Sequence, residues 1–259
     1  MEVHAHTHTA RKKWTHYLWE FLMLFLAVFC GFLAENQREH FVEQKRAREY
    51  AKSLLNDLRV DTNEIRRGKH WAEFMMASID SLSSIAANDK MVKDAPGSFY
   101  YYSTFLYYAF IIDWSRSTLD QLIQSGSLRY FGNKELVDLI NLYYYTQNII
   151  NEQNHQDFIQ RDKITEIRNH ILQLRYYRIF GKLDMGKEEY GDQPSPLIDS
   201  LLTQRLPLQA DAEKEMDEFI NHIIDRRSRL ELVSQNYYPW ANDLAIKIIQ
   251  ILTKEYHLQ

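Results

Sequence analysis

The sequence predicts an all-α protein in which an N-terminal transmembrane helix continues into a domain built as a bundle of long helices. Three observations lead to this prediction. The 259 residues include only 8 glycines and 5 prolines, too few for the many tight turns of an all-β fold. One stretch near the N-terminus is almost entirely apolar, and the long segments after it show helical periodicity with few Gly or Pro interruptions.

Composition limits the possible functions. Hydrophobic residues make up 45% of the chain and charged residues 25%, which is ordinary for a globular protein and argues against wholesale disorder. A net charge of -4 gives no electrostatic reason to expect a nucleic-acid partner. The single cysteine, Cys30, excludes an intrachain disulfide framework and a cysteine-based zinc site.

Residues 14–36 are predicted to form the transmembrane helix, after a flexible, His-rich and basic segment at 1–13. Between positions 21 and 34 the only polar side chain is the weakly polar thiol of Cys30. Counted from position 17, the run is about 27 Å long as a helix, close to the ~30 Å hydrocarbon core of a bilayer. Residues suited to the membrane interface precede or begin the run: Arg11, Lys12, Lys13, Trp14, Tyr17 and Trp19.

Two alternatives compete for the same apolar run, a cleaved signal peptide and the core helix of a soluble protein. A signal peptide needs small residues at −3 and −1 of its cleavage site, and Phe32 occupies −3 when Ala34 is −1. A lipoprotein signal needs a small residue before the cysteine, where this chain has Phe29. A soluble core helix does not account for the basic and aromatic flanks, so we expect a single-pass membrane anchor.

Glu20 is a candidate functional residue, because a carboxylate at membrane depth is energetically costly. One interpretation is that it serves an ion path or faces a helix of another subunit. The other is that it lies near the basic end of the span, reaches the headgroup region and pairs with His16 one turn earlier.

The orientation of the span rests on the basic residues around it. Those that crowd against its start favour a cytoplasmic N-terminus, whereas the larger number within about 20 residues after it favours the reverse. We expect the first arrangement, with the helical domain outside the cytoplasm.

Residues 37–259 are predicted to form the bundle, which begins with a long helix over positions 38–87. Apolar residues recur there every seven positions, with a second series three positions further on, as in coiled coils and bundles. Asp61 and Gly68 occupy two places in the second series, so packing within one chain is expected rather than a pure coiled coil. The apolar residues of this seam are Leu58, Ile65, Ala72, Met75, Ile79 and Leu82.

Farther along, residues 88–97 and 181–196 are predicted to be loops. Residues 98–114 are rich in aromatic side chains, and their periodicity fits a helix or an extended segment. We expect Ser117 to cap a short helix that ends at 125–127, and Asn133 to cap a helix-patterned segment that reaches position 180. Asp211 should cap the final helical run, which Pro239 should kink or split.

The search for catalytic motifs is negative. The sequence contains no Gly-rich phosphate loop, no G-x-S-x-G nucleophile elbow and no H-E-x-x-H zinc helix. We therefore expect no enzymatic activity, no cofactor and no metal site. His4, His6 and His8 alternate in a way that permits loose metal binding, but we favour a solvated terminus without a ligand.

Tyrosine is unusually frequent, with 17 residues that include two triplets. One interpretation is that Tyr100, Tyr101 and Tyr102 converge with Trp114 on an aromatic ligand pocket between helices. The simpler interpretation, which we favour, is that the tyrosine rings pack in the bundle and keep their hydroxyl groups at its edge.

Several segments resemble a family of single-span bacterial membrane proteins of unknown function that is common in Bacteroidota. The resemblance is most specific over residues 10–40, continues over 50–61 and is suggestive over 117–145. The matching pairs and triplets in the last segment are Thr118-Leu119, Ser125-Gly126, Lys134-Glu135-Leu136 and Tyr143-Tyr144. The resemblance implies the membrane anchor and assigns no activity or catalytic residue.

We therefore expect a non-enzymatic, membrane-anchored helical protein that acts through contacts with a protein partner or with copies of itself, as a scaffold, assembly subunit or sensor-like module. A ligand-binding domain with an aromatic pocket is one alternative. A homo-oligomeric membrane assembly in which Glu20 faces another subunit is the second alternative.

Overall fold

The computed structural model describes residues 14–180 and 200–258, so the expectations for positions 1–13, including their three histidines, and for the loop at 181–196 lie outside it. Within the described residues the chain is almost entirely helical, which confirms the all-α fold class. The chain divides into two compact units between Tyr50 and Ala51. The first unit contains the beginning of α1 (Trp14–Asn88), and the second contains the rest of α1 and every later element.

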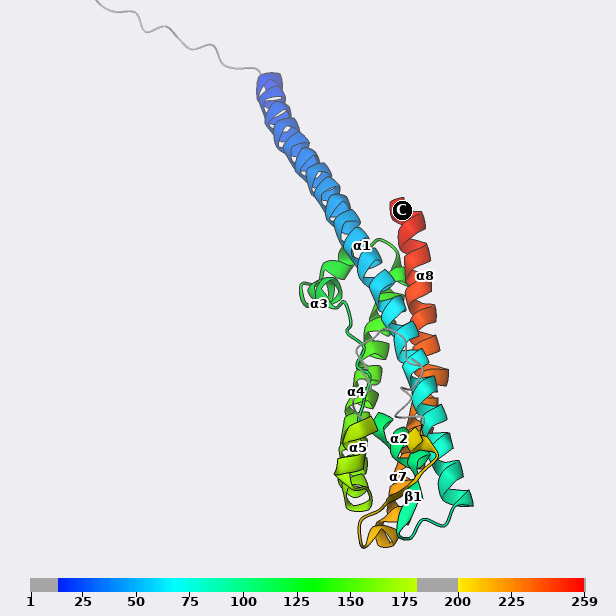
Figure 1. Cartoon of the computed structure of the whole chain (residues 1–259). Coiled ribbons are helices and arrows are strands. Elements are labelled where there is room, and N and C mark those ends of the chain that lie inside the picture. Colours follow the sequence, from blue (N-terminus) through cyan, green and yellow to red (C-terminus); the bar gives the residue numbers. More distant parts are fainter. Residues whose placement is uncertain (1–13, 181–199, 259) are drawn as a thin grey trace, which may run out of the picture. The chain divides into compact units, whose positions relative to one another are not determined.

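The elements that follow α1 are mostly helices (Figure 1). They are β1 (Asp94–Pro96), α2 (Gly97–Phe105), α3 (Ser117–Gln124), η1 (Ser127–Tyr130), α4 (Lys134–Ile171), α5 (Leu174–Phe180), β2 (Arg205–Pro207), α7 (Ala212–Leu232), η2 (Val233–Tyr237) and α8 (Tyr238–Tyr256). In the second unit α4 packs along both α7 and α8.

α1 is a single helix of 75 residues, and the predicted long helix at 38–87 is confirmed within it. All six apolar residues of the predicted seam are buried, because they fall on the face of α1 that packs into the second unit. Trp71 stacks on Phe110, and Phe74 meets Phe105 edge to face with ring centroids 4.9 Å apart. Aromatic rings thus extend the seam into the surrounding elements.

The two residues that interrupt the seam are both buried. A Cβ atom at Gly68 would lie 3.1 Å from the Phe110 ring and 3.2 Å from the Tyr238 ring. The missing side chain therefore lets two aromatic rings approach the backbone of α1. The other residue, Asp61, accepts hydrogen bonds inside the bundle and is described below.

The predicted helix ends are correct where local chemistry decides them. Asn133 caps α4, since its side-chain oxygen accepts a hydrogen bond from the Leu136 N–H at 3.2 Å. Gly126 adopts a left-handed conformation after α3, with φ of 68°. The predicted cap at Ser117 is wrong, because Arg116 holds the cap position of α3. Asp211 holds the N-cap position of α7 as predicted, but its carboxylate pairs with Lys214 instead of a backbone N–H.

Pro239 interrupts the last helical run, as predicted. The run changes from α-helix to the π-helical segment η2 immediately before the first turn of α8, which contains the proline. Proline has no N–H to donate and its ring crowds the preceding turn, so the wider π turn relieves both problems.

Two short strands and one helix break were not predicted from the sequence. β1 lies within the predicted loop at 88–97 and pairs antiparallel with β2, with Ala95 opposite Leu206. The helix expected to reach position 180 breaks after α4, where Leu172 forms an isolated bridge with Leu208 and the Gln173 N–H donates to the Tyr100 hydroxyl. In both cases the partner is remote in sequence, so no local signal marks the change.

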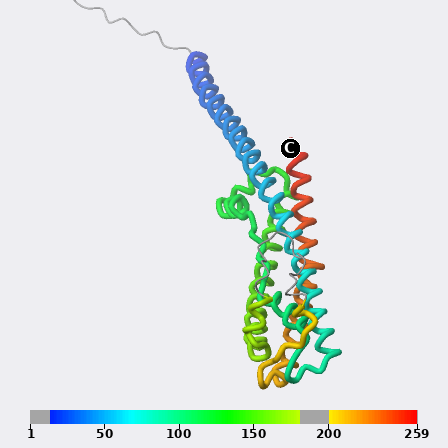
Figure 2. The backbone as a smooth tube through the Cα atoms, in the orientation of Figure 1, coloured from blue at the N-terminus to red at the C-terminus, as the bar shows by residue number. Residues whose placement is uncertain are grey.

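One connection in the second unit is long and irregular. Residues 106–116, here called the strap, join α2 to α3 without regular secondary structure (Figure 2). The strap runs antiparallel to α4, since Tyr107 contacts Arg161 near its beginning and Arg116 contacts Asn148 near its end.

Gly68→Val should destabilise the protein by about 1–3 kcal/mol, because the branched side chain would overlap the rings of Phe110 and Tyr238. Urea unfolding of the two proteins would measure the difference. Gly132→Val is the control, since a Cβ atom there meets no atom within 4 Å. Equal losses in the two variants would contradict close packing at Gly68.

Candidate functional site

The strap has to satisfy its backbone polar groups among helices whose own backbones are already paired. Buried N–H and C=O groups without partners cost about 1–3 kcal/mol each. Side chains from α1, α4 and α7 supply partners to the strap. The candidate site is therefore a set of six residues, here called the anchor residues, which are buried except for the half-buried Asn151: Asp61, Tyr143, Gln147, Asn151, Asp157 and Arg226.

Asp61 is the anchor at the end of the strap. Its Oδ1 accepts a hydrogen bond from the Ser115 N–H at 2.8 Å. Its Oδ2 accepts hydrogen bonds from the Tyr143 hydroxyl at 2.7 Å and from Gln147 Nε2 at 3.1 Å. One carboxylate thus ties α1, α4 and the strap together.

Burial controls the ionisation of this group. It raises the pKa of Asp61, and the three hydrogen bonds, which favour the charged form, only partly offset that effect. Burial and the nearby Asp61 carboxylate also raise the pKa of the Tyr143 hydroxyl well above its ordinary value. Both side chains are about 1% exposed, so a substrate cannot reach the pair in this conformation.

Trp114 lies beside this centre. Its Nε1–H donates to Asn151 Oδ1 at 2.8 Å, and its ring meets Tyr143 edge to face. Arg116, the last residue of the strap, donates to Asn148 and lies over the Tyr144 ring. The indole of Trp114 therefore joins the strap to α4.

Arg226 anchors the beginning of the strap. It is completely buried and forms two hydrogen bonds with Asp157, from Nε at 2.8 Å and from Nη2 at 2.9 Å. The same guanidinium donates to the carbonyl oxygens of Leu106 at 2.6 Å and Tyr108 at 2.7 Å. A planar group with five N–H donors suits this combination of carboxylate and backbone partners.

The four residues of the predicted aromatic pocket have different partners. Tyr100 is fully buried, and its hydroxyl donates to the Pro207 carbonyl oxygen at 2.7 Å. Tyr101 and Tyr102 are half-buried and pack edge to face against each other. Tyr100 and Tyr101 also contact Phe180, whereas the ring of Trp114 contacts Tyr143. The convergence of all four residues on one ligand pocket stays a prediction.

Glu20 lies on the first compact unit. Its Oε1 is 3.3 Å from His16 Nε2, the partner that the sequence suggested, and both side chains are about half exposed. A role for Glu20 in an ion path or a subunit contact stays a prediction.

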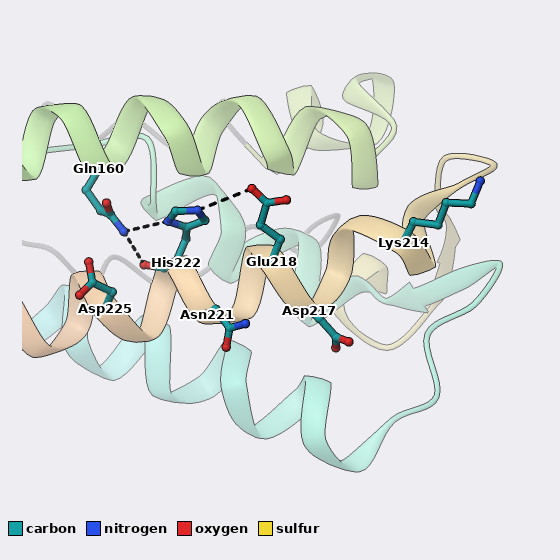
Figure 3. Close-up of a pocket in the computed structure, with 7 residues that line it drawn as sticks. All are labelled: Gln160, Lys214, Asp217, Glu218, Asn221, His222 and Asp225. Atoms are coloured by element: carbon teal, nitrogen blue, oxygen red, sulfur yellow. Dashed lines mark hydrogen bonds and ion pairs between the residues drawn. The ribbon is translucent and has the colours of Figure 1, made fainter.

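One open pocket lies between α4 and α7 (Figure 3). It has a volume of about 560 Å³, and none of the four predicted aromatic residues lines it. His222 lies at its centre, where Gln160 Nε2 donates to the His222 carbonyl oxygen at 3.1 Å and Glu218 Oε1 is 3.7 Å from His222 Nε2. The lining is polar throughout: Gln160, Lys214, Asp217, Glu218, Asn221, His222 and Asp225.

Across residues 14–180 and 200–258, no group of three or more His, Cys, Asp or Glu residues is placed to hold a metal ion. The alternating histidines near the N-terminus lie outside these residues.

From the sequence, Asp61 was identified only as an interruption of the apolar seam, and Asp157 and Arg226 were not identified. A charged residue on the buried face of a helix is a usable signal, because such residues are rarely buried without a partner. Asp61 carried that signal. Arg226 carried it as well, because it lies on the buried face of α7 with Phe219, Ile223 and Leu230. Its partner Asp157 is 69 residues away, so the pair could not be predicted.

Comparison of the chain with protein-family models, curated proteins and solved structures gives no match. The resemblance to the bacterial single-span family therefore stays a prediction.

Asp61→Asn should make the variant gain stability relative to the parent as the pH rises from about 4 to 7. Since folding raises the pKa of Asp61, its contribution is complete at acid pH and is lost as the pH rises through the folded-state pKa. The asparagine amide does not ionise and avoids this loss. Urea unfolding at several pH values would measure the difference, with exposed Asp113→Asn as the control. A difference independent of pH would contradict the shift.

Arg226→Gln should cost about 3–5 kcal/mol of stability, because it leaves Asp157 buried without its cation and deprives two carbonyl groups of a donor. The neighbouring Arg227 is a matched control, since it pairs with Asp80 and Glu231 at the surface. Arg227→Gln should cost less than about 1 kcal/mol. Thermal and urea unfolding would compare the two, and similar losses would show that burial does not set the strength of the Arg226 pair.

Proposed function

We propose that this protein is a single-pass protein of the bacterial inner membrane whose helical domain, on the periplasmic side, acts through contacts with other proteins. Its role would be that of a scaffold, an assembly subunit or a sensor-like module, without enzymatic activity. The proposal includes the bilayer as one partner and a protein as the other.

The observation that carries the proposal is an exposed apolar segment in the first compact unit. α1 contains an 18-residue window with a mean hydropathy of 2.0, none of which is buried within the protein. Large apolar side chains there are strongly exposed, among them Phe21, Leu24 and Val28. A bilayer would cover this surface, and the length of the segment suits the hydrocarbon core.

The continuity of α1 supports a sensor-like role. The same helix contains the apolar segment and, without a break, Asp61 at the end of the strap. The closed environment of Asp61 and Tyr143 fits a role in holding the strap to the bundle better than it fits catalysis.

Membrane attachment can be tested with a matched pair of substitutions on α1. The parent protein should stay with native membranes after an alkaline carbonate wash. Val28→Arg places a charge in the apolar segment, at a cost of about 3 kcal/mol in the bilayer, and should lower the membrane-bound fraction. Val60→Arg, at an exposed valine beyond the segment, is the control and should leave that fraction unchanged. Release of the parent protein by the wash would contradict the proposal.

Orientation can be tested by cysteine labelling. Cys30 is the only cysteine, so Cys30→Ala gives a background without thiols. Lys214 is 75% exposed, and Lys214→Cys in that background should react with a membrane-impermeant maleimide in spheroplasts. Labelling that requires permeabilisation of the inner membrane would place the domain in the cytoplasm instead.

A partner can be sought with the full-length protein at its native level. Crosslinking in membranes, followed by mild detergent extraction and mass spectrometry, should recover a reproducible stoichiometric partner. Recovery of a defined homo-oligomer alone would instead favour the assembly in which Glu20 faces another subunit.

A further inference from the structure

The bundle contains two buried arginines, and they differ in their partners. Arg226 is fully buried and pairs with the Asp157 carboxylate. Arg168, in the last turn of α4, is 3% exposed, and the partners it has among the described residues are neutral oxygens. Its Nη1 donates to the Tyr177 hydroxyl at 3.0 Å, and its Nη2 donates to Asn169 Oδ1 at 3.1 Å.

The described residues give Arg168 no carboxylate partner. The nearest acidic residues along α4 are engaged elsewhere, since Asp162 pairs with Arg161 and Glu166 pairs with Lys163. The Nε–H of Arg168 is buried and has no hydrogen-bond partner among these residues. A buried cation in this state is costly, because the lost hydration is not replaced by an opposite charge.

Weaker interactions offset part of that cost. The guanidinium lies over the Tyr177 ring, with Cζ 4.4 Å from the ring centroid. The C-terminal turn of α4 adds partial negative charge from its carbonyl groups. Burial nevertheless lowers the pKa of Arg168, so the environment as a whole disfavours the cation.

The surroundings favour an anion at this position. An arginine binds a planar or tetrahedral oxyanion through two parallel N–H groups, and the Nε–Nη2 edge of Arg168 still has its Nε–H to offer. Arg161 lies against the strap's Tyr107, with Cζ 5.7 Å from that ring centroid, and its own charge is paired with Asp162. Tyr107 is 53% exposed, and its charge interaction with Arg168 raises the pKa of that guanidinium, so the two side chains lie near each other.

We propose that Arg168 is the core of a binding site for a small oxyanion, a carboxylate or a phosphate group, between α4, α5 and the strap. The Tyr107 side chain moves aside to admit the anion, since exposed side chains change rotamer within nanoseconds. The anion then accepts parallel hydrogen bonds from Nε and Nη2. This site is independent of the membrane anchor, so its failure would not contradict the proposed function.

Thermal unfolding of the full-length protein in detergent tests the site with defined probes. At pH 7, about 50 mM sodium phosphate or sodium acetate should raise the unfolding temperature by at least ~3 °C over sodium chloride of equal ionic strength. A rise with phosphate alone would identify a phosphate site, and a rise with acetate alone would identify a carboxylate site. No rise with either salt would overturn the proposal.

Substitutions separate this site from general salt effects. Arg168→Met removes the cation and should abolish the rise, whereas Arg168→Lys keeps the charge without the planar edge and should reduce it. The lysine variant keeps the test decisive if the methionine variant does not fold. Arg66→Gln, at an exposed arginine of α1, should respond as the parent does. A full response in either Arg168 variant would overturn the proposal.

Discussion

The structure depends on how an irregular backbone segment is accommodated beside long helices. A helix satisfies its own N–H and C=O groups, so it offers few backbone partners to a neighbour. The strap therefore draws on side chains, with Asp61 accepting from Ser115 at one end and Arg226 donating to Leu106 and Tyr108 at the other. These charges are costly to bury, and their positions fix which residues of the strap face α4.

The sequence predicted what adjacent residues decide. Asn133 caps α4 with its own side chain, Pro239 cannot continue an α-helix, and the seam of α1 repeats with a period that only one helix face can bury. The strands β1 and β2 were not predictable, because each has three residues and pairs with a segment more than 100 positions away. The break after α4 also depends on residues distant in sequence, since Leu172 pairs with Leu208 and the Gln173 N–H donates to the Tyr100 hydroxyl.

The candidate site was predictable only in fragments. Aromatic composition identified Tyr100 and Trp114 as notable, but α2 ends at Phe105, and the strap then takes Trp114 to Asn151 of α4. Where a side chain arrives after an irregular segment depends on tertiary contacts that local patterns do not contain. Asp61 was visible as a polar residue in an apolar seam, although its partners Tyr143 and Gln147 lie more than 80 positions away.

The two buried arginines show why burial alone does not define a role. At Arg226 the fold provides a carboxylate and two carbonyl groups, so each N–H that points inward has a fixed acceptor and the group is structural. At Arg168 the acceptors are neutral, and the Nε–H lacks one among the described residues. An added anion would gain little at Arg226 because the charge there is already compensated. At Arg168 the same anion would recover electrostatic energy that the described residues leave unused, which is the condition for selective binding.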